Sequence, residues 1–156
     1  MHRFFLSPDC IRSESVIFPE EVARQIARVL RLQAGAAVIV LDGQGREYEV
    51  VLDSVEPRAV TGSVRAERAA GGEPSVHLTL FVGLTQREKF EWVLQKCTEV
   101  GAAAFAPFTS ARTLVQSSHE SARKLDRWKK IVREAAEQSR RGRAPAKGLY
   151  AFPGGR

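Results

Sequence analysis

Cysteine is scarce in this sequence, and long hydrophobic runs are missing. Of its 156 residues only Cys10 and Cys97 are cysteines. They lie far apart without CxxC spacing, so neither a disulfide framework nor a zinc site is predicted. No stretch approaches the roughly 20 apolar residues that cross a bilayer, and the first ten residues lack the apolar core of a signal peptide. We therefore expect a cytoplasmic protein with no membrane partner.

Motifs that announce an active site by themselves are also missing. The sequence contains no Walker loop, no GxGxxG, no cluster of metal ligands and no Gly-x-Ser-x-Gly elbow. Its three histidines, His2, His77 and His119, are scattered. The residues alone therefore assign neither a catalytic group nor a metal site.

Positive charge is present, and it is placed unevenly. Residues 117–156 contain eleven Lys or Arg against four Asp or Glu, a net charge of +7, whereas residues 1–116 carry −1. A basic segment on a nearly neutral body is typical of proteins that bind nucleic acid. Charge alone leaves a solvated helical face equally open.

The N-terminal part reads as several short strands with one helix. Pro19 is expected to occupy the first helical position, with Val22, Ile26, Val29 and Leu30 buried and with Gly35 ending the helix. The glycine-rich run 42–45 predicts a hairpin between strands 36–41 and 46–55, and a third strand follows at 60–64. This pattern favours a small β-barrel over residues 1–70, followed by a linker at 71–75.

The second part, residues 76–146, reads as a β-α-β unit with a further helix. An apolar run at 76–84 and another at 102–108, the latter stopping at Pro107, predict buried parallel strands. Between them, Thr85 and Glu88 form a capping-box pattern that starts a helix, and Gly101 suits its C-terminal end. The apolar stripe of this helix consists of Phe90, Val93, Leu94, Cys97 and Val100.

The second helix is expected after another capping-box pattern at Ser117 and Glu120. Its predicted buried side consists of Ala122, Leu125, Trp128, Ile131, Val132 and Ala135. Lysines and arginines crowd the rest of this helix.

Several short motifs occur together in one order. They are Arg3-Phe4-Phe5, Val29-Leu30-Arg31-Leu32, Asp42-Gly43, residues 88–92 (EKFEW), 95–101 (QKCTEVG), Pro107, Ser110-Ala111-Arg112, 127–132 (RWKKIV) and 134–139 (EAAEQS), followed by Arg141, Arg143 and Pro145. In this order the chain resembles, over roughly residues 3–145, the RsmE family of 16S ribosomal RNA uridine N3-methyltransferases, of the SPOUT class.

The resemblance implies an α/β fold, α+β overall, in two parts. An N-terminal PUA-like barrel would bind RNA, and a SPOUT domain with a parallel sheet would end in a knot that holds S-adenosylmethionine. It further implies a homodimer that acts on 16S ribosomal RNA or the small ribosomal subunit in ribosome biogenesis. The glycine-rich signature of the knot is not found, and the tail 147–156 does not match, so we expect the cofactor pocket to be absent from these residues.

Six arginines are predicted to bind RNA on the strength of this resemblance and of their charge: Arg3, Arg28, Arg31, Arg112, Arg141 and Arg143. Arginine stabilises negative charge without titrating. The alternative for Arg112, Arg141 and Arg143 is ordinary surface charge or an ion pair with a carboxylate such as Glu99 or Glu137. For the whole chain, the alternatives to a methyltransferase are a non-catalytic RNA-binding module and an inactive, poorly folded remnant.

Overall fold

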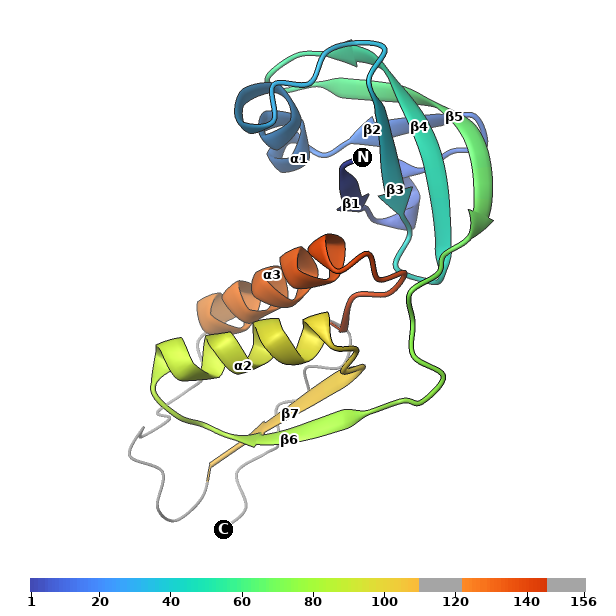
Figure 1. Cartoon of the computed structure of the whole chain (residues 1–156). Coiled ribbons are helices and arrows are strands. Elements are labelled where there is room, and N and C mark those ends of the chain that lie inside the picture. Colours follow the sequence, from blue (N-terminus) through green and yellow to red (C-terminus); the bar gives the residue numbers. More distant parts are fainter. Residues whose placement is uncertain (110–121, 146–156) are drawn as a thin grey trace. The chain divides into compact units, whose positions relative to one another are not determined.

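The computed structural model describes residues 1–109 and 122–145, and it divides into two compact units (Figure 1). Unit 1 is Met1–Gly71, and unit 2 begins at Gly72. The predicted capping box at Ser117 and Glu120 and the tail 147–156 lie outside the described residues.

Unit 1 is a curled five-stranded sheet, a half-barrel that confirms the expected fold class. The strands are β1 (Arg3–Phe5), β2 (Ser15–Phe18), β3 (Ala37–Leu41), β4 (Arg46–Val55) and β5 (Val60–Ala69), with a 3₁₀ turn at Pro8–Cys10. Their order is β1-β3-β4-β5-β2. Only β1 and β3 pair in parallel, and the other pairs are antiparallel. The two edges of the sheet are therefore β1 and β2.

The predicted hairpin joins β3 to β4 and is held by one carboxylate. Asp42 Oδ1 accepts hydrogen bonds from the backbone N–H groups of Gln44 (2.7 Å) and Arg46 (3.1 Å). Further along, β5 approaches β4 closely at Gly62, where an added Cβ would lie 2.5 Å from Val50 Cγ1 and 2.9 Å from the Val51 carbonyl oxygen. Glycine is required there by space.

The helix of unit 1 departs from the prediction. It is α1 (Glu20–Arg24) with Pro19 as its N-cap, and it continues as a π-helical turn, Gln25–Val29. A π turn inserts an extra residue and rotates the faces that follow it. Val29 is consequently 72% exposed, so its predicted burial is wrong. Gly35 is likewise not the end of the helix.

The core of unit 1 lies inside the curled sheet under this helix. Its buried residues are Phe4, Leu6, Val16, Phe18, Ala23, Ile26, Val38, Val40, Val50, Leu52 and Val60. The phenyl rings of Phe4 and Phe18 meet edge to face at 6.3 Å. The periodicity-two pattern of the strands accounts for this burial, since alternate side chains point to one face.

Unit 2 contains the predicted parallel strand pair, with shorter bounds. β6 is Thr79–Gly83 and β7 is Ala104–Phe108, paired in parallel from Thr79 opposite Ala104 to Gly83 opposite Phe108. The expected stop at Pro107 is wrong, because β7 continues through it. In a two-stranded sheet each strand is an edge, so a residue without an N–H can face away from the partner.

Helix α2 (Arg87–Glu99) begins one residue later than the capping pattern suggested. Gln86 is its N-cap without a side-chain hydrogen bond, so the capping box is not formed. Its C-terminus is as predicted: Gly101 has φ +104°, and Gly101 N and Ala102 N donate to the Thr98 and Cys97 carbonyl oxygens. This is a Schellman motif. Val100 is 81% exposed and Thr98 is buried in its place, which corrects the predicted stripe.

Helix α3 (Ala122–Gln138) packs beside α2 on β6 and β7 (Figure 1). The core of unit 2 consists of Leu84, Phe90, Leu94, Ala102, Phe105, Trp128 and Val132. Phe90 and Trp128 join the helices, with ring centroids 4.5 Å apart. Of the predicted stripe, Leu125 and Ile131 are only partly buried, and the Ala122 side chain lies outside the described residues.

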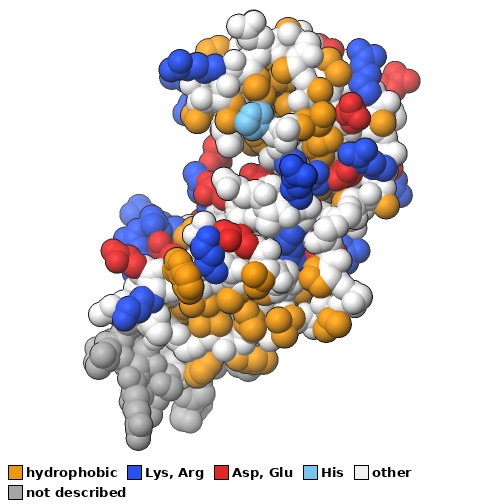
Figure 2. Space-filling model, viewed as in Figure 1, with side chains coloured by type: hydrophobic (Ala, Val, Ile, Leu, Met, Phe, Trp, Pro, Cys, Tyr) orange, Lys and Arg blue, Asp and Glu red, His pale blue; other side chains and the backbone are white. Residues whose placement is uncertain are grey.

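Apolar side chains also gather on the surface of unit 2 over β6 (Figure 2). Val76, Leu78 and Phe81 are 69%, 50% and 66% exposed. In the described part of the chain, no helix is both long and apolar enough to span a membrane.

Candidate RNA-binding site

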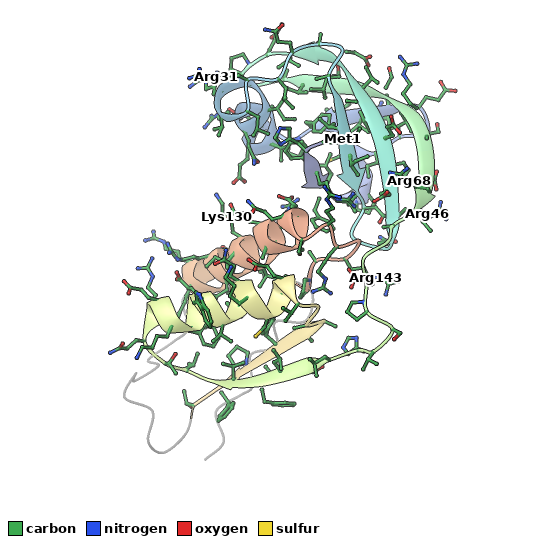
Figure 3. All side chains as sticks on the ribbon, in the orientation of Figure 1. Met1, Arg31, Arg46, Arg68, Lys130 and Arg143 are labelled. Atoms are coloured by element: carbon green, nitrogen blue, oxygen red, sulfur yellow. The ribbon has the colours of Figure 1, made fainter. Side chains whose placement is uncertain are left out.

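Arg28 and Arg31 project from the end of the helical segment of unit 1. Both are exposed, and within residues 1–109 and 122–145 neither forms an ion pair. Arg31 has φ +52°, a conformation usually left to glycine, and it is labelled at the tip of this turn in Figure 3. By contrast, Arg24 one turn earlier pairs with Glu20 at 2.5 Å. Arg28 and Arg31 are thus available to an anion.

Arg3 is placed differently, in a three-residue ion cluster of the sheet. The carboxylate of Glu47 lies between Arg3 Nη2 and Arg68 Nε, each 2.5 Å away. Burial would raise the pKa of Glu47, but the hydrogen bonds and charges of Arg68 and Arg3 outweigh it and hold the pKa below its usual range. Arg3 is therefore occupied, which favours a structural role.

Arg141 is buried, with 2% of its surface exposed, and forms an ion pair in unit 2. Its Nε and Nη2 donate to Glu73 at 3.2 and 2.7 Å, and its Nη1 donates to the carbonyl oxygens of Thr98 (3.2 Å) and Ala102 (2.6 Å). These bonds join the segment before β6, the end of α2 and the end of α3. The carboxylate partner is neither Glu99 nor Glu137, the two that the sequence suggested.

Arg143 and Arg112 complete the predicted set. The backbone N–H of Arg143 donates to Glu73 at 2.9 Å, while its side chain is exposed (Figure 3). Arg112 lies outside the described residues. The structure thus places Arg28, Arg31 and Arg143 on the surface and encloses Arg3 and Arg141.

A cavity of about 390 Å³, here called the basic pocket, opens beside the first turns of α2 and α3. It is lined by Leu84, Thr85, Arg87, Phe90, Glu91, Arg123, Lys124, Arg127 and Trp128. It lies at the carboxyl end of β6, the edge at which α/β folds bind their ligands. The cations of α3 are evident in the sequence, but nothing in it groups them with Arg87, because the two helices start 35 residues apart.

Glu91 orients two of the arginines in the basic pocket. Its Oε1 accepts from Arg127 Nε (2.6 Å) and Arg87 Nε (3.1 Å), and its Oε2 accepts from Arg127 Nη2 (2.8 Å). The Arg127 hydrogen bond, together with Arg87, outweighs burial and lowers the pKa of Glu91. Lys124 Nζ lies 5.0 Å from the ring centroid of Trp128. Among the described residues that line the pocket, four are cations and one is a carboxylate.

A second hollow of about 410 Å³, here called the acidic groove, runs between the same helices. It is lined by Glu88, Glu91, Trp92, Gln95, Glu99, Arg127, Ile131, Glu134, Ala135 and Gln138. Glu91 and Arg127 separate the two hollows, since they line both. Four carboxylates and one guanidinium give the groove the opposite sign of charge.

The chemistry offered by the described residues is anion binding. Residues 1–109 and 122–145 contain no group of three His, Cys, Asp or Glu side chains arranged to hold a metal ion. The basic pocket presents donors of fixed charge. It can hold a phosphate group, and the described residues that line it include no histidine.

Comparison with known proteins identifies both units. A family model described as an RNA methyltransferase domain matches residues 72–148, and one described as an RNA methyltransferase PUA domain matches residues 18–64. The first match begins with unit 2, and the second lies within unit 1. The class is therefore that of RNA methyltransferases with a PUA-type unit ahead of an α/β unit.

Two curated relatives are named ribosomal RNA small subunit methyltransferase E. The Synechocystis protein is 35% identical over 140 residues, which are 90% of this chain and 45% of the relative. The Bacillus subtilis protein is 36% identical over 126 residues, 80% of this chain and 49% of the relative. The chain belongs to the RsmE family, as its motifs indicated. It spans about half the length of the curated relatives it matches.

A solved structure of an RsmE protein has a similar fold. Ribosomal RNA small subunit methyltransferase E from Neisseria gonorrhoeae, crystallised with S-adenosyl methionine, matches with a TM-score of 0.83 at 28% identity, covering 92% of this chain and 59% of that chain. Likeness at this level confirms the predicted fold.

Proposed function

We propose that this chain serves S-adenosylmethionine-dependent methylation of ribosomal RNA, at ring nitrogen 3 of a uridine in 16S RNA, as a homodimer in the cytoplasm. The observation that supports the proposal most directly is the order of the two units, a PUA-type half-barrel followed by the parallel β-α-β unit. The same order is matched by relatives named small subunit methyltransferases.

The described residues supply RNA binding in this reaction. Arg28 and Arg31 of unit 1 and Arg143 of unit 2 are exposed cations of the predicted set. Phosphate contacts of this kind position an RNA and carry no sequence information. Arg3 and Arg141 are expected to support these surfaces from within.

The methyl donor requires different surroundings from those in the basic pocket. S-adenosylmethionine carries a positive sulfonium, and the pocket already gathers Arg87, Arg123, Lys124 and Arg127. Like charges repel, so these residues do not fit the donor. We place no step of the methyl transfer on them.

A second candidate is a non-catalytic RNA-binding module, favoured by the fixed-charge character of the described surfaces. One experiment separates the two. The 156-residue protein is incubated with small-subunit RNA and methyl-labelled S-adenosylmethionine, and RNA affinity is measured from 50 to 500 mM salt. Label at uridine N3 supports the methyltransferase. Affinity that falls steeply with salt, without label, supports the module. A flat salt dependence without label contradicts both.

A further inference from the structure

We propose that the basic pocket of unit 2 binds a backbone phosphate of the RNA. The inference rests on the proposed function and deepens it, because it names a contact that the methyltransferase unit makes itself. The pocket shares no residue with the six arginines predicted from the sequence. It would give unit 2 a hold on RNA that does not depend on unit 1.

The arginines of the pocket are oriented and still have donors to give. Arg87 and Arg127 use their Nε atoms, and Arg127 also uses Nη2, on Glu91. The remaining Nη atoms have no hydrogen-bond partner among the described residues. The side chains are 66% and 51% exposed, so these donors can reach a ligand. Glu91 thus holds two guanidinium groups in place and leaves some of their N–H donors for a ligand. This orientation lowers the entropy cost of binding.

Arg123 and Lys124 add two further cations on the α3 side. In the part of the chain that the structure describes, Arg123 forms no ion pair. Lys124 lies over Trp128, 5.0 Å from the ring centroid. With Glu91 counted, the described residues that line the pocket carry a net charge of +3. A phosphodiester, with one negative charge and two free oxygens, suits several converging N–H donors.

The aromatic residues argue for phosphate and against a base. Proteins bind unpaired bases by stacking them on exposed aromatic faces. Trp128 and Phe90 are 2% and 1% exposed, so neither offers a face to a base. Instead, together with Leu84, they form an apolar floor beneath the cations. Near such a floor a charge is less screened by water, and its attraction for phosphate is stronger.

The neighbouring acidic groove limits the path that an RNA strand bound at the basic pocket can take. Beyond the Glu91–Arg127 pair, Glu88, Glu99 and Glu134 face the groove and repel phosphate. An RNA strand on the basic pocket would therefore turn away from the groove and stay at the carboxyl ends of β6 and β7, which lie at the same edge of the sheet. This is the side on which ligands of α/β folds bind.

The test compares two double variants that remove the same charge. R123Q/K124Q empties the pocket of two cations and leaves the Glu91 cluster intact. K89Q/K129Q removes two exposed lysines of the same helices that line neither hollow. Affinity for a small-subunit RNA fragment is measured against salt for both variants and the unchanged chain. Thermal melts verify that each variant folds.

The pocket variant should lose one phosphate contact. The slope of log affinity against log salt should fall by about 0.7, and binding at 0.15 M salt should weaken roughly fourfold. The control should keep nearly the full slope. Equal losses in both variants would overturn the proposal, because long-range attraction alone would then explain them. A flat salt dependence of the unchanged chain would instead count against the proposed function as a whole.

A second arm separates RNA phosphate from free phosphate. Inorganic phosphate is titrated while NMR follows the side-chain signals of the arginines, with RNA already bound or absent. RNA bound at the pocket should block the phosphate-induced shifts of Arg87 and Arg127. If those shifts are the same with RNA present, the pocket is a free-anion site and the RNA assignment is wrong.

Discussion

Each unit of this chain holds one glutamate between two arginines, and the two clusters behave differently. In unit 1, Glu47 on β4 binds Arg3 on β1 and Arg68 on β5. In unit 2, Glu91 on α2 binds Arg87 of the same helix and Arg127 of α3. The clusters differ at Arg3, whose side chain is only 14% exposed, whereas Arg68, Arg87 and Arg127 are each more than half exposed.

The difference shows that an ion pair with glutamate does not by itself distinguish a structural arginine from an arginine that can bind a ligand. Around Glu47 the cluster ties three strands of a curled sheet together and encloses Arg3, whose Nε is buried without a hydrogen-bond partner among the described residues. Around Glu91 the same carboxylate chemistry leaves arginine donors facing a cavity. Exposure decides between the two uses, because an enclosed guanidinium cannot reach a ligand. Variants of Arg141, Glu47 and Glu91 test this contrast, and two turn residues give the smallest effects.

The largest effect is expected at Arg141, which is even more enclosed than Arg3. Arg141→Met would remove the buried guanidinium from Glu73 and from the Thr98 and Ala102 carbonyl oxygens, and breaking such a buried pair costs about 3–5 kcal/mol. Among the described residues, Glu73 would keep only the backbone N–H of Arg143. Hydrogen exchange should rise across residues 72–145 and stay unchanged in 1–71. Arg143→Met removes an exposed guanidinium nearby and should leave exchange unaltered. Equal exchange in both variants would show that Arg141 is not the anchor.

Glu47→Gln should cost unit 1 roughly 2 kcal/mol at neutral pH, the size of a charged hydrogen-bond loss. The pKa of Glu47 is lower in the folded than in the unfolded state. Its stabilisation is therefore complete above the unfolded pKa and disappears as the pH falls through the folded one. Denaturant melts of the variant and the unchanged chain should converge in acid. Glu14→Gln, an exposed control, should have the same stability as the unchanged chain at every pH. If the stability of Glu47→Gln stays below that of the unchanged chain by the same amount at every pH, the cluster does not have this role.

Glu91→Gln should destabilise the protein less than Glu47→Gln, because its arginines are well exposed and screened by water. Its effect on RNA should be larger. The variant raises the charge of the basic pocket by one, so affinity at low salt should increase and the salt dependence should steepen. Filter binding at 50 and 300 mM salt measures both. Weaker binding at low salt would mean that orientation by Glu91 outweighs its charge.

The smallest effects compare two turn residues. Asp42→Ala removes an acceptor from two backbone N–H groups in unit 1 and should cost about 1 kcal/mol. Thr85→Ala should change the free energy of unfolding by less than about 0.5 kcal/mol, because Thr85 caps no helix here. Urea titrations of the two variants decide. A loss of about 1 kcal/mol for Thr85→Ala would indicate that Thr85 caps α2 after all, as the sequence suggested.

Much of the fold could be predicted because the signals are local. The hairpin at Asp42, the C-terminus of α2 at Gly101 and the apolar runs of β6 and β7 each depend on a few adjacent residues. Errors arose where a turn changed the helical period, as at Val29 after the π turn. They also arose where a strand began only after the apolar run had started, as at Val76 and Leu78 before β6. Neither event has a signature within one element.

The candidate site was less predictable. Arg141 carries the same charge in the sequence as Arg143, yet only the fold sets Glu73 beside it, 68 residues earlier in the chain. Likewise, Arg87 and Arg127 belong to one cluster only because Phe90 packs against Trp128 and brings α2 onto α3.

The sequence by itself determined the family, the parallel strand pair and the sign of the charge, because residue order, periodicity and ionisation are properties of the chain. Which arginines are enclosed and which face a cavity was decided only by the tertiary structure. Burial and the distance to a carboxylate on another element do not exist until the helices and strands pack.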